Sequence, residues 1–129
     1  MPAKSAKARK QKGRNLEQWV ADQIREKGLD PRANPSFGSG SGTREKADIY
    51  TSMMILGQNA GFECKHADNL KTQDWWRQTK KLESLGREPI LVMKQTGYDY
   101  GDTLAVIYLD TLLEMAKKID ELEKKLSTL

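Results

Sequence analysis

A helical segment lies between two strand-like segments near the middle of the chain. Residues 61–66 are expected to form a strand, and residues 89–95 contain a short apolar run typical of a buried strand. The apolar side chains of residues 69–85 recur three and four positions apart, which is the spacing of one helix face, and Gly86 is expected to end that helix. A strand, a helix and a second strand in this order predict an α/β fold.

The flanking segments extend this pattern in both directions. A first helix is expected from Asn15, whose side chain can cap it, to Gly28. The order α, β, β, α, β, β, α in 129 residues predicts a single domain with a central mixed sheet flanked by helices. The other expected elements are strands at residues 47–51 and 103–110, a continuation or partner strand at 52–56, a turn at 57–59 and a last helix at 111–129.

The positive charge of the chain is concentrated at its N-terminal end. The net charge is +4, but residues 1–14 carry six basic side chains and no acidic one, which leaves 22 − 6 = 16 bases against 18 acids elsewhere. We expect residues 1–14 to form a flexible basic tail and residues 15–129 to form the folded domain. Such a tail can bind phosphates through counterion release, or it can be a disordered end that only aids solubility.

Cysteine content and hydrophobicity bear on the cellular compartment. The single cysteine, Cys64, excludes an internal disulfide and a cysteine-rich zinc site. No apolar run approaches the roughly 20 residues that cross a bilayer, and the N-terminus lacks the apolar segment of a secretory signal. These features predict a protein of the cytoplasm, or of the host cytoplasm if a phage encodes it.

An acidic and a basic side chain share one face of the strand expected at residues 61–66. Because side chains alternate along a strand, Glu63 and Lys65 point to one face while Phe62 and Cys64 point to the other and can enter a core. Asp48 opens a neighbouring strand, so its carboxylate can converge with that of Glu63. Two such carboxylates suit Mg²⁺, which keeps waters for a substrate phosphate, and a lysine beside them can orient or deprotonate the attacking water.

Glu17 is a candidate third carboxylate. It lies at the edge of the apolar face of the first helix, about 20° around the helix axis from Ile24. The alternative is an ordinary surface ion pair between Glu63 and Lys65, because an acid two residues from a lysine is a common pattern. The presence of Glu17, Asp48 and a Gly- and Ser-rich segment at residues 30–44, expected to be a mobile loop, favours the metal site.

These residues, taken in order, resemble the PD-(D/E)XK nuclease superfamily and, within it, the archaeal-type Holliday junction resolvases that also occur in phages. The resemblance covers residues 12–110. Ala47 stands where the family usually has proline, a position that shapes the backbone and performs no chemistry. The matching segments are Lys12-Gly13-Arg14-Asn15-Leu16-Glu17, residues 38–42, Ala47-Asp48-Ile49-Tyr50, Phe62-Glu63-Cys64-Lys65 and Gln78.

The resemblance implies a restriction-endonuclease-like fold and a role for each matching side chain. Glu17, Asp48 and Glu63 would bind Mg²⁺, for which Mn²⁺ could substitute, and Lys65 would assist the attacking water. Ser39 would lie near the scissile phosphate, and Gln78 would line the site. The residues expected to contact DNA are Lys10, Lys12, Arg14, Arg44 and Lys46.

The function implied by the resemblance is Mg²⁺-dependent resolution of four-way DNA junctions by a structure-specific endonuclease. One alternative is another nuclease of the same fold that cuts branched, nicked or linear DNA. The other is a non-catalytic basic protein that binds DNA and whose acidic residues form ion pairs.

The last expected helix carries a heptad pattern of apolar side chains. A four-way junction has two strands to cut and the chain has one set of site residues, so we expect a homodimer. The heptad seam and the strand at residues 104–109 are candidate interfaces, and a combination of both is favoured because the seam is short; docking of the seam on the chain's own sheet is the alternative. The seam consists of Leu112, Met115, Ile119, Leu122, Leu126 and Leu129.

Overall fold

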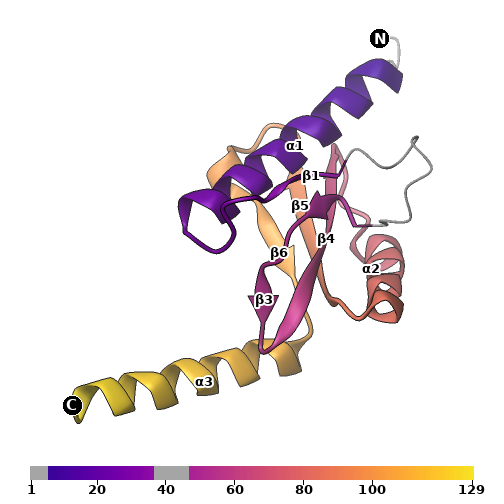
Figure 1. Cartoon of the computed structure of the whole chain (residues 1–129). Helices are drawn as coiled ribbons and strands as arrows, with labels where there is room; N and C mark the ends of the chain where they lie inside the picture. The colour runs from indigo at the N-terminus through magenta and orange to yellow at the C-terminus, as the bar shows by residue number, and fades with distance from the viewer. Residues whose placement is uncertain (1–5, 37–46) are drawn as a thin grey trace.

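The computed structural model describes residues 6–36 and 47–129, which form one α/β domain (Figure 1). The helices are α1 (Ala6–Glu26), α2 (Thr72–Lys80) and α3 (Leu109–Ser127), with short 3-10 helices η2 (Lys81–Leu85) and η3 (Tyr100–Asp102). The strands are β1 (Asn34–Pro35), β2 (Ile49–Tyr50), β3 (Met54–Ile55), β4 (Gln58–Ala67), β5 (Glu88–Gln95) and β6 (Leu104–Val106).

The main sheet has four strands in the order β3-β4-β5-β6 and is mixed, as predicted. The central strands β4 and β5 run parallel, with Ala60 opposite Glu88 and Ala67 opposite Gln95, and α2 with η2 connects them. The edge strands β3 and β6 are antiparallel to their neighbours. A separate two-stranded antiparallel sheet pairs β1 with β2.

The two faces of the central strands pack against different helices. Phe62 and Cys64 of β4 join the buried side chains of α1 in one apolar cluster, which confirms that these two residues face a core. On the other face, Gly61 lies under η2: an added Cβ would come within 3.1 Å of the Leu82 side chain and 2.9 Å of Arg87. Glycine therefore allows η2 to approach the face that also carries Glu63 and Lys65.

The first helix begins at Ala6, so its expected start at Asn15 is wrong. Asn15 lies inside the helix, where its Oδ1 accepts a hydrogen bond from Gln11 Nε2 at 2.9 Å. Residues 6–14 of the expected flexible tail are helical because alanine, lysine, arginine and glutamine all favour helices, and this outweighs Gly13. The basic segment is an extension of α1 beyond the sheet (Figure 1).

Several strand boundaries differ from those expected. The segment 30–44 contains β1, whose Pro35 pairs with Ile49 of β2, and residues 37–46 of the expected mobile loop lie outside the described part of the chain. The expected strands at 47–51 and 103–110 shrink to β2 and β6, since the backbone leaves the extended pairing within a few residues.

Residues 52–56 contain β3, which, contrary to expectation, neither continues β2 nor pairs with it, because β3 pairs with the start of β4. The turn falls at Leu56 and Gly57, both with positive φ (51° and 82°), one position earlier than the expected 57–59. Two residues with positive φ give the tight hairpin turn that suits the twist of paired strands.

The helix expected at residues 69–85 is divided into α2 and η2, and Gly86 ends it in the left-handed conformation with φ 74°, as predicted. The last helix, α3, starts at Leu109, so Leu109 and Asp110 belong to it and not to a strand. Asp110 lies in the first turn of α3, where the helix dipole stabilises an acidic side chain.

None of the side chains of α3 is buried, and the helix projects from the sheet (Figure 1). Only Met115 packs against the domain core, as a partly buried side chain. The alternative in which the heptad seam docks on the chain's own sheet is therefore wrong. No helix of the described segments is long and apolar enough to cross a membrane.

Candidate active site

Asp48 is held against the edge of β4 by its backbone and its side chain. Its N–H donates to the Phe62 carbonyl at 2.8 Å, and its Oδ2 accepts the N–H of Cys64 at 2.8 Å. On its other side the Asp48 carbonyl accepts the N–H of Ser36 at 2.7 Å. Asp48 therefore has a fixed position between the β1 segment and β4, although β2 begins only at the next residue.

Asp30 fixes the chain where it leaves β2. This buried carboxylate accepts hydrogen bonds from Thr51 Oγ1 at 2.7 Å and from the N–H groups of Ser52 and Arg32, each at 2.9 Å. These bonds hold the pKa of Asp30 below its ordinary value. This buried polar network therefore fixes the chain just after β2, on the C-terminal side of Asp48. The sequence pattern did not predict it.

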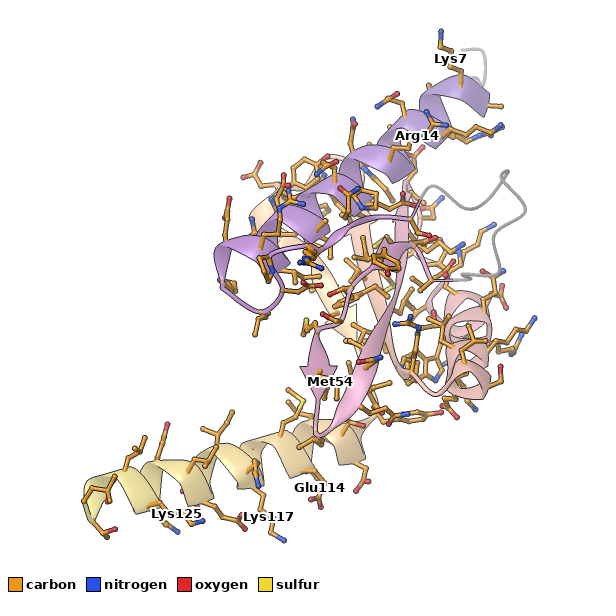
Figure 2. All side chains as sticks on the ribbon, in the orientation of Figure 1. Lys7, Arg14, Met54, Glu114, Lys117 and Lys125 are labelled. Atoms are coloured by element: carbon orange, nitrogen blue, oxygen red, sulfur yellow. The ribbon has the colours of Figure 1, made fainter. Side chains whose placement is uncertain are left out.

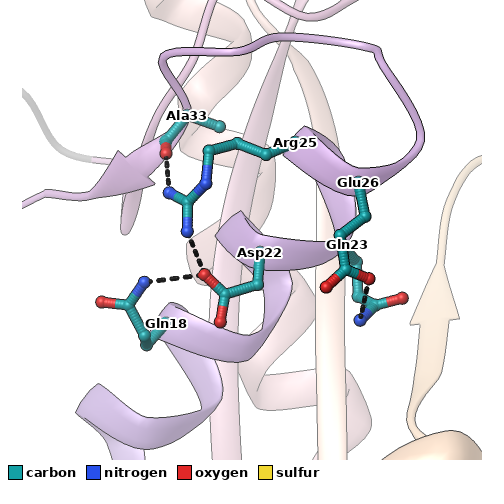
Figure 3. A network of polar contacts seen from close by, with 6 residues as sticks. All are labelled: Gln18, Asp22, Gln23, Arg25, Glu26 and Ala33. Carbon is teal, nitrogen blue, oxygen red and sulfur yellow. Dashed lines mark hydrogen bonds and ion pairs between the residues drawn. The ribbon is translucent and has the colours of Figure 1, made fainter.

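A second polar network ties α1 to the segment that leads into β1 (Figure 3). The Arg25 guanidinium donates to the Ala33 carbonyl and pairs with Asp22, whose Oδ1 also accepts Gln18 Nε2 at 3.0 Å. Gln23 and Glu26 form a separate contact on the same helix. Arg25 therefore helps to set the position of β1 relative to α1.

Glu63 and Lys65 lie side by side on β4. Lys65 Nζ is 3.4 Å from Glu63 Oε1, and their side chains are 28% and 17% exposed, respectively. Their shared face follows from strand alternation, as expected. The pair is neither a fully solvated surface contact nor a sealed core pair, so it retains access to a ligand.

Glu17 reaches the same place from α1. The pKa of Glu17 is raised to about 7, first by burial and then by the negative charges of Asp48 and Glu63, while the Arg14 guanidinium opposes the rise. These electrostatic interactions place Glu17 within range of both other carboxylates. Glu17 lies on a helix and Glu63 on a central strand, as predicted, whereas Asp48 precedes the strand that it was expected to open.

Burial also raises the pKa of Asp48, with the Cys64 N–H and Lys65 acting against it. The pKa of Glu63 is raised by burial and then by Asp48, and Lys65 lowers it. The same three acids raise the pKa of the buried Cys64 thiol, after burial itself. A cluster of desolvated acids that repel one another is stabilised by a bound proton or a bound cation.

The donor set suits a hard cation but is not a closed metal cage. Within the described residues, no group of three or more His, Cys, Asp or Glu side chains could hold a metal ion on its own. Mg²⁺ needs only one or two carboxylates when waters and a substrate phosphate complete its shell. Asp48 and Glu63, with Glu17 near them, fit that requirement.

The other candidate residues lie in different environments. Gln78 is exposed on α2, and no interaction of the described residues joins it to the carboxylates. Lys10 and Arg14 are exposed on α1. Ser39, Arg44 and Lys46 lie outside the described residues.

Lys12, a predicted DNA contact, is partly buried and contacts residues of its own domain. Its Nζ donates to Thr96 Oγ1 at 3.3 Å and lies 3.9 Å from Asp68 Oδ1. Asp68 and Thr96, which we did not predict, follow the C-terminal ends of β4 and β5. The signal available in the sequence was the parallel order of these strands, because it brings their C-terminal ends together.

Comparison of the chain with protein-family models, curated proteins and solved structures gives no match.

Proposed function

We propose that this protein is a metal-dependent DNA endonuclease with Glu17, Asp48, Glu63 and Lys65 at its active site. The observation that carries the proposal is that the Asp48 carboxylate is bonded to the Cys64 N–H, between the paired Glu63 and Lys65 on β4, with Glu17 in electrostatic range. Perturbed acids gathered at a partly open position are typical of functional sites. A surface ion pair would not need Asp48 and Glu17 beside it.

In this proposal Asp48 and Glu63, with Glu17 near them, would hold Mg²⁺ or Mn²⁺ together with waters and the substrate phosphate. The bound ion would polarise a phosphate oxygen and lower the pKa of a coordinated water. The Cys64 N–H orients the Asp48 carboxylate, so this ligand needs little reorganisation. The Lys65 ammonium, 3.4 Å from Glu63 Oε1, can orient the attacking water or offset negative charge at phosphorus.

The basic extension of α1 supports DNA as the substrate. Lys7, Lys10 and Arg14 are exposed on the same helix that carries Glu17, and the helix projects past the sheet at this end (Figure 2). Exposed cations on a projecting helix suit contacts to a phosphate backbone. The extension could therefore position DNA over the carboxylates.

Within this class, we propose a four-way junction as the preferred substrate and a restriction-endonuclease-like fold as the scaffold. Both rest on the resemblance of the ordered residues to the archaeal-type resolvases. A two-fold substrate would be cut most simply by two copies of the chain. The alternative within the same class is a nuclease that acts on branched, nicked or linear DNA.

Cleavage of a four-way junction and of a linear duplex with the same arms, each with Mg²⁺ or with EDTA, tests the proposal. We expect cutting of the junction that depends on Mg²⁺ and exceeds cutting of the duplex. Equal cutting of both substrates would support the nuclease activity but refute the proposed preference for junctions. Tight binding of the junction without cleavage in either Mg²⁺ or Mn²⁺ would refute the proposal that the protein is an enzyme.

A further inference from the structure

The C-terminal helix α3 carries a row of apolar side chains that its own domain leaves uncovered. Glu114 and Lys117, on the side of the helix that faces away from the sheet (Figure 2), take the c and f positions of the heptad, opposite this row. A contiguous apolar row on a projecting helix is typical of an interaction surface. The row, called here the α3 seam, consists of Leu112 (48% exposed), Ile119 (54%), Leu122 (48%) and Leu126 (67%).

The charges on α3 argue against a membrane or a nucleic acid as the occupant. The helix contains four lysines and five acids, so its net charge is 4 − 5 = −1. Helices that bind anionic lipid surfaces or DNA carry an excess of basic side chains on their polar face. The basic residues of this chain are concentrated instead on α1, so a protein partner fits the seam better.

The residues that flank the seam are complementary to a second copy of the same helix. When the seam occupies the a and d positions of a heptad, Lys118 takes a g position and Glu123 takes the following e position. In a parallel pair, g of one helix faces the next e of the other, so Lys118 would face Glu123 of the second copy twice by symmetry. In an antiparallel pair, g faces g, and Lys118 would face lysines.

We propose that α3 pairs with α3 of a second copy as a short parallel coiled coil, in register along the α3 seam. The symmetry is a two-fold axis along the helix pair, which places both domains at the N-terminal end of the coil. Met115 lies between Leu112 and Ile119 in the same row and packs partly against the domain core. The interface stands independently of the nuclease proposal, because it would form in a protein with no activity.

The oligomeric mass of the full-length protein is the first test. At about 100 μM, enough to populate a dimer held by only two heptads, light scattering should give a dimer for the wild type. Leu122→Ala with Leu126→Ala should give a monomer, and the matched polar-face control Lys117→Ala with Glu121→Ala should remain a dimer. Alanine keeps helix propensity high, so helical circular dichroism should be unchanged in all three. A monomeric wild type, or a dimer that survives the seam double variant, would overturn the proposal.

Charge exchange tests the parallel orientation. Lys118→Glu alone should weaken the dimer by about tenfold, since two attractive pairs become repulsive. Adding Glu123→Lys to it should restore the wild-type dissociation constant. A dimer that is strengthened by Lys118→Glu alone would indicate antiparallel helices and refute the proposed arrangement.

A cysteine at the end of the coil gives an independent test of orientation. In parallel helices, Leu129→Cys should form a disulfide between copies on mild oxidation, whereas antiparallel packing would separate the two ends by roughly the length of α3. The buried Cys64 should not cross-link in the wild-type control. Absence of the disulfide in a Leu129→Cys dimer would contradict the parallel register.

Discussion

Helices α1 and α3 have similar lengths, 21 and 19 residues, and both carry an apolar stripe, yet they meet the domain in opposite ways. The C-terminal half of α1 buries Leu16, Val20 and Ile24 against the sheet, whereas α3 buries no side chain. The charges differ as well, because the projecting half of α1 is basic and α3 is nearly neutral. A hydrophobic period thus identifies a helix face but not the surface that will cover it.

DNA cleavage should depend on the carboxylate of α1 and not on those of α3. The largest expected effect is therefore on the rate of cleavage. Glu17→Gln, Asp48→Asn and Glu63→Gln should each reduce junction cleavage by about a thousandfold or more, because each removes a charge that would hold the metal ion. Glu121→Gln on α3 is the matched control and should cut normally. Binding of the junction should change little in all four variants, as measured by gel shift in Ca²⁺.

Near-normal cleavage by Asp48→Asn or Glu63→Gln would exclude these residues from the active site. Lys65→Ala should also lose cleavage while it retains binding. If Lys65→Ala instead loses binding, the lysine is a phosphate contact and not a partner of the attacking water.

Packing gives the second contrast between the two helices. Leu16 is 0% exposed, so Leu16→Ala should lower the free energy of unfolding by about 3 kcal/mol through lost burial and the cavity left behind. Leu122 is 48% exposed, and Leu122→Ala should change the free energy of unfolding of the monomer by less than about 0.5 kcal/mol. Urea unfolding at a protein concentration low enough to dissociate dimers measures both. Equal losses would mean that α3 packs on its own domain.

The third contrast concerns DNA binding by the basic extension. Lys7→Ala with Lys10→Ala should flatten the slope of log affinity against log salt by about 2, since two phosphate contacts are lost. Lys117→Ala with Lys125→Ala on α3 removes the same charge and should leave the slope unchanged. Fluorescence anisotropy with a junction substrate over a range of salt concentrations measures this. Equal effects of the two pairs would mean that DNA is attracted only by the overall charge of the protein.

The sequence predicted which side chains share a strand face better than it predicted where the elements begin and end. Strand alternation alone placed Glu63 and Lys65 on one face and Cys64 in the core, because the period of two is rigid. The helical extension to Ala6 was missed because a run of lysine and arginine was interpreted through its charge and not through its helix propensity.

Contacts between distant segments could not be predicted from local pattern. The Cys64 N–H that orients Asp48 and the bonds that hold Asp30 join residues brought together only by the sheet. The same limit applies to α3, since the apolar period is local and its partner is not. Sequence pattern therefore gives the residues of the candidate site, and the fold supplies the contacts that fix their positions.

The smallest expected effect is the pH dependence of stability that Glu17 produces in metal-free protein. Burial, Asp48 and Glu63 raise the pKa of Glu17 from 4.5 to about 7. Between these values the folded protein holds a proton that the unfolded chain has lost, so the free energy of unfolding falls as the pH rises from about 4.5 to about 7 and then levels off. Because Glu17 is half-exposed, solvent screening should limit this contribution to about 1 kcal/mol.

Urea unfolding in EDTA from pH 5 to pH 8 should show this decline in the wild type. It should be shallower in Glu17→Gln, which cannot ionise, and unchanged in the α3 control Glu121→Gln. Addition of Mg²⁺ at pH 8 should then stabilise the wild type more than Glu17→Gln, since a cation relieves the repulsion that the lost proton had masked. A decline that persists unaltered in Glu17→Gln would show that Asp48 and Glu63 repel each other without Glu17. The contribution of α1 to the site would then be limited to packing, and neither α1 nor α3 would supply a carboxylate to it.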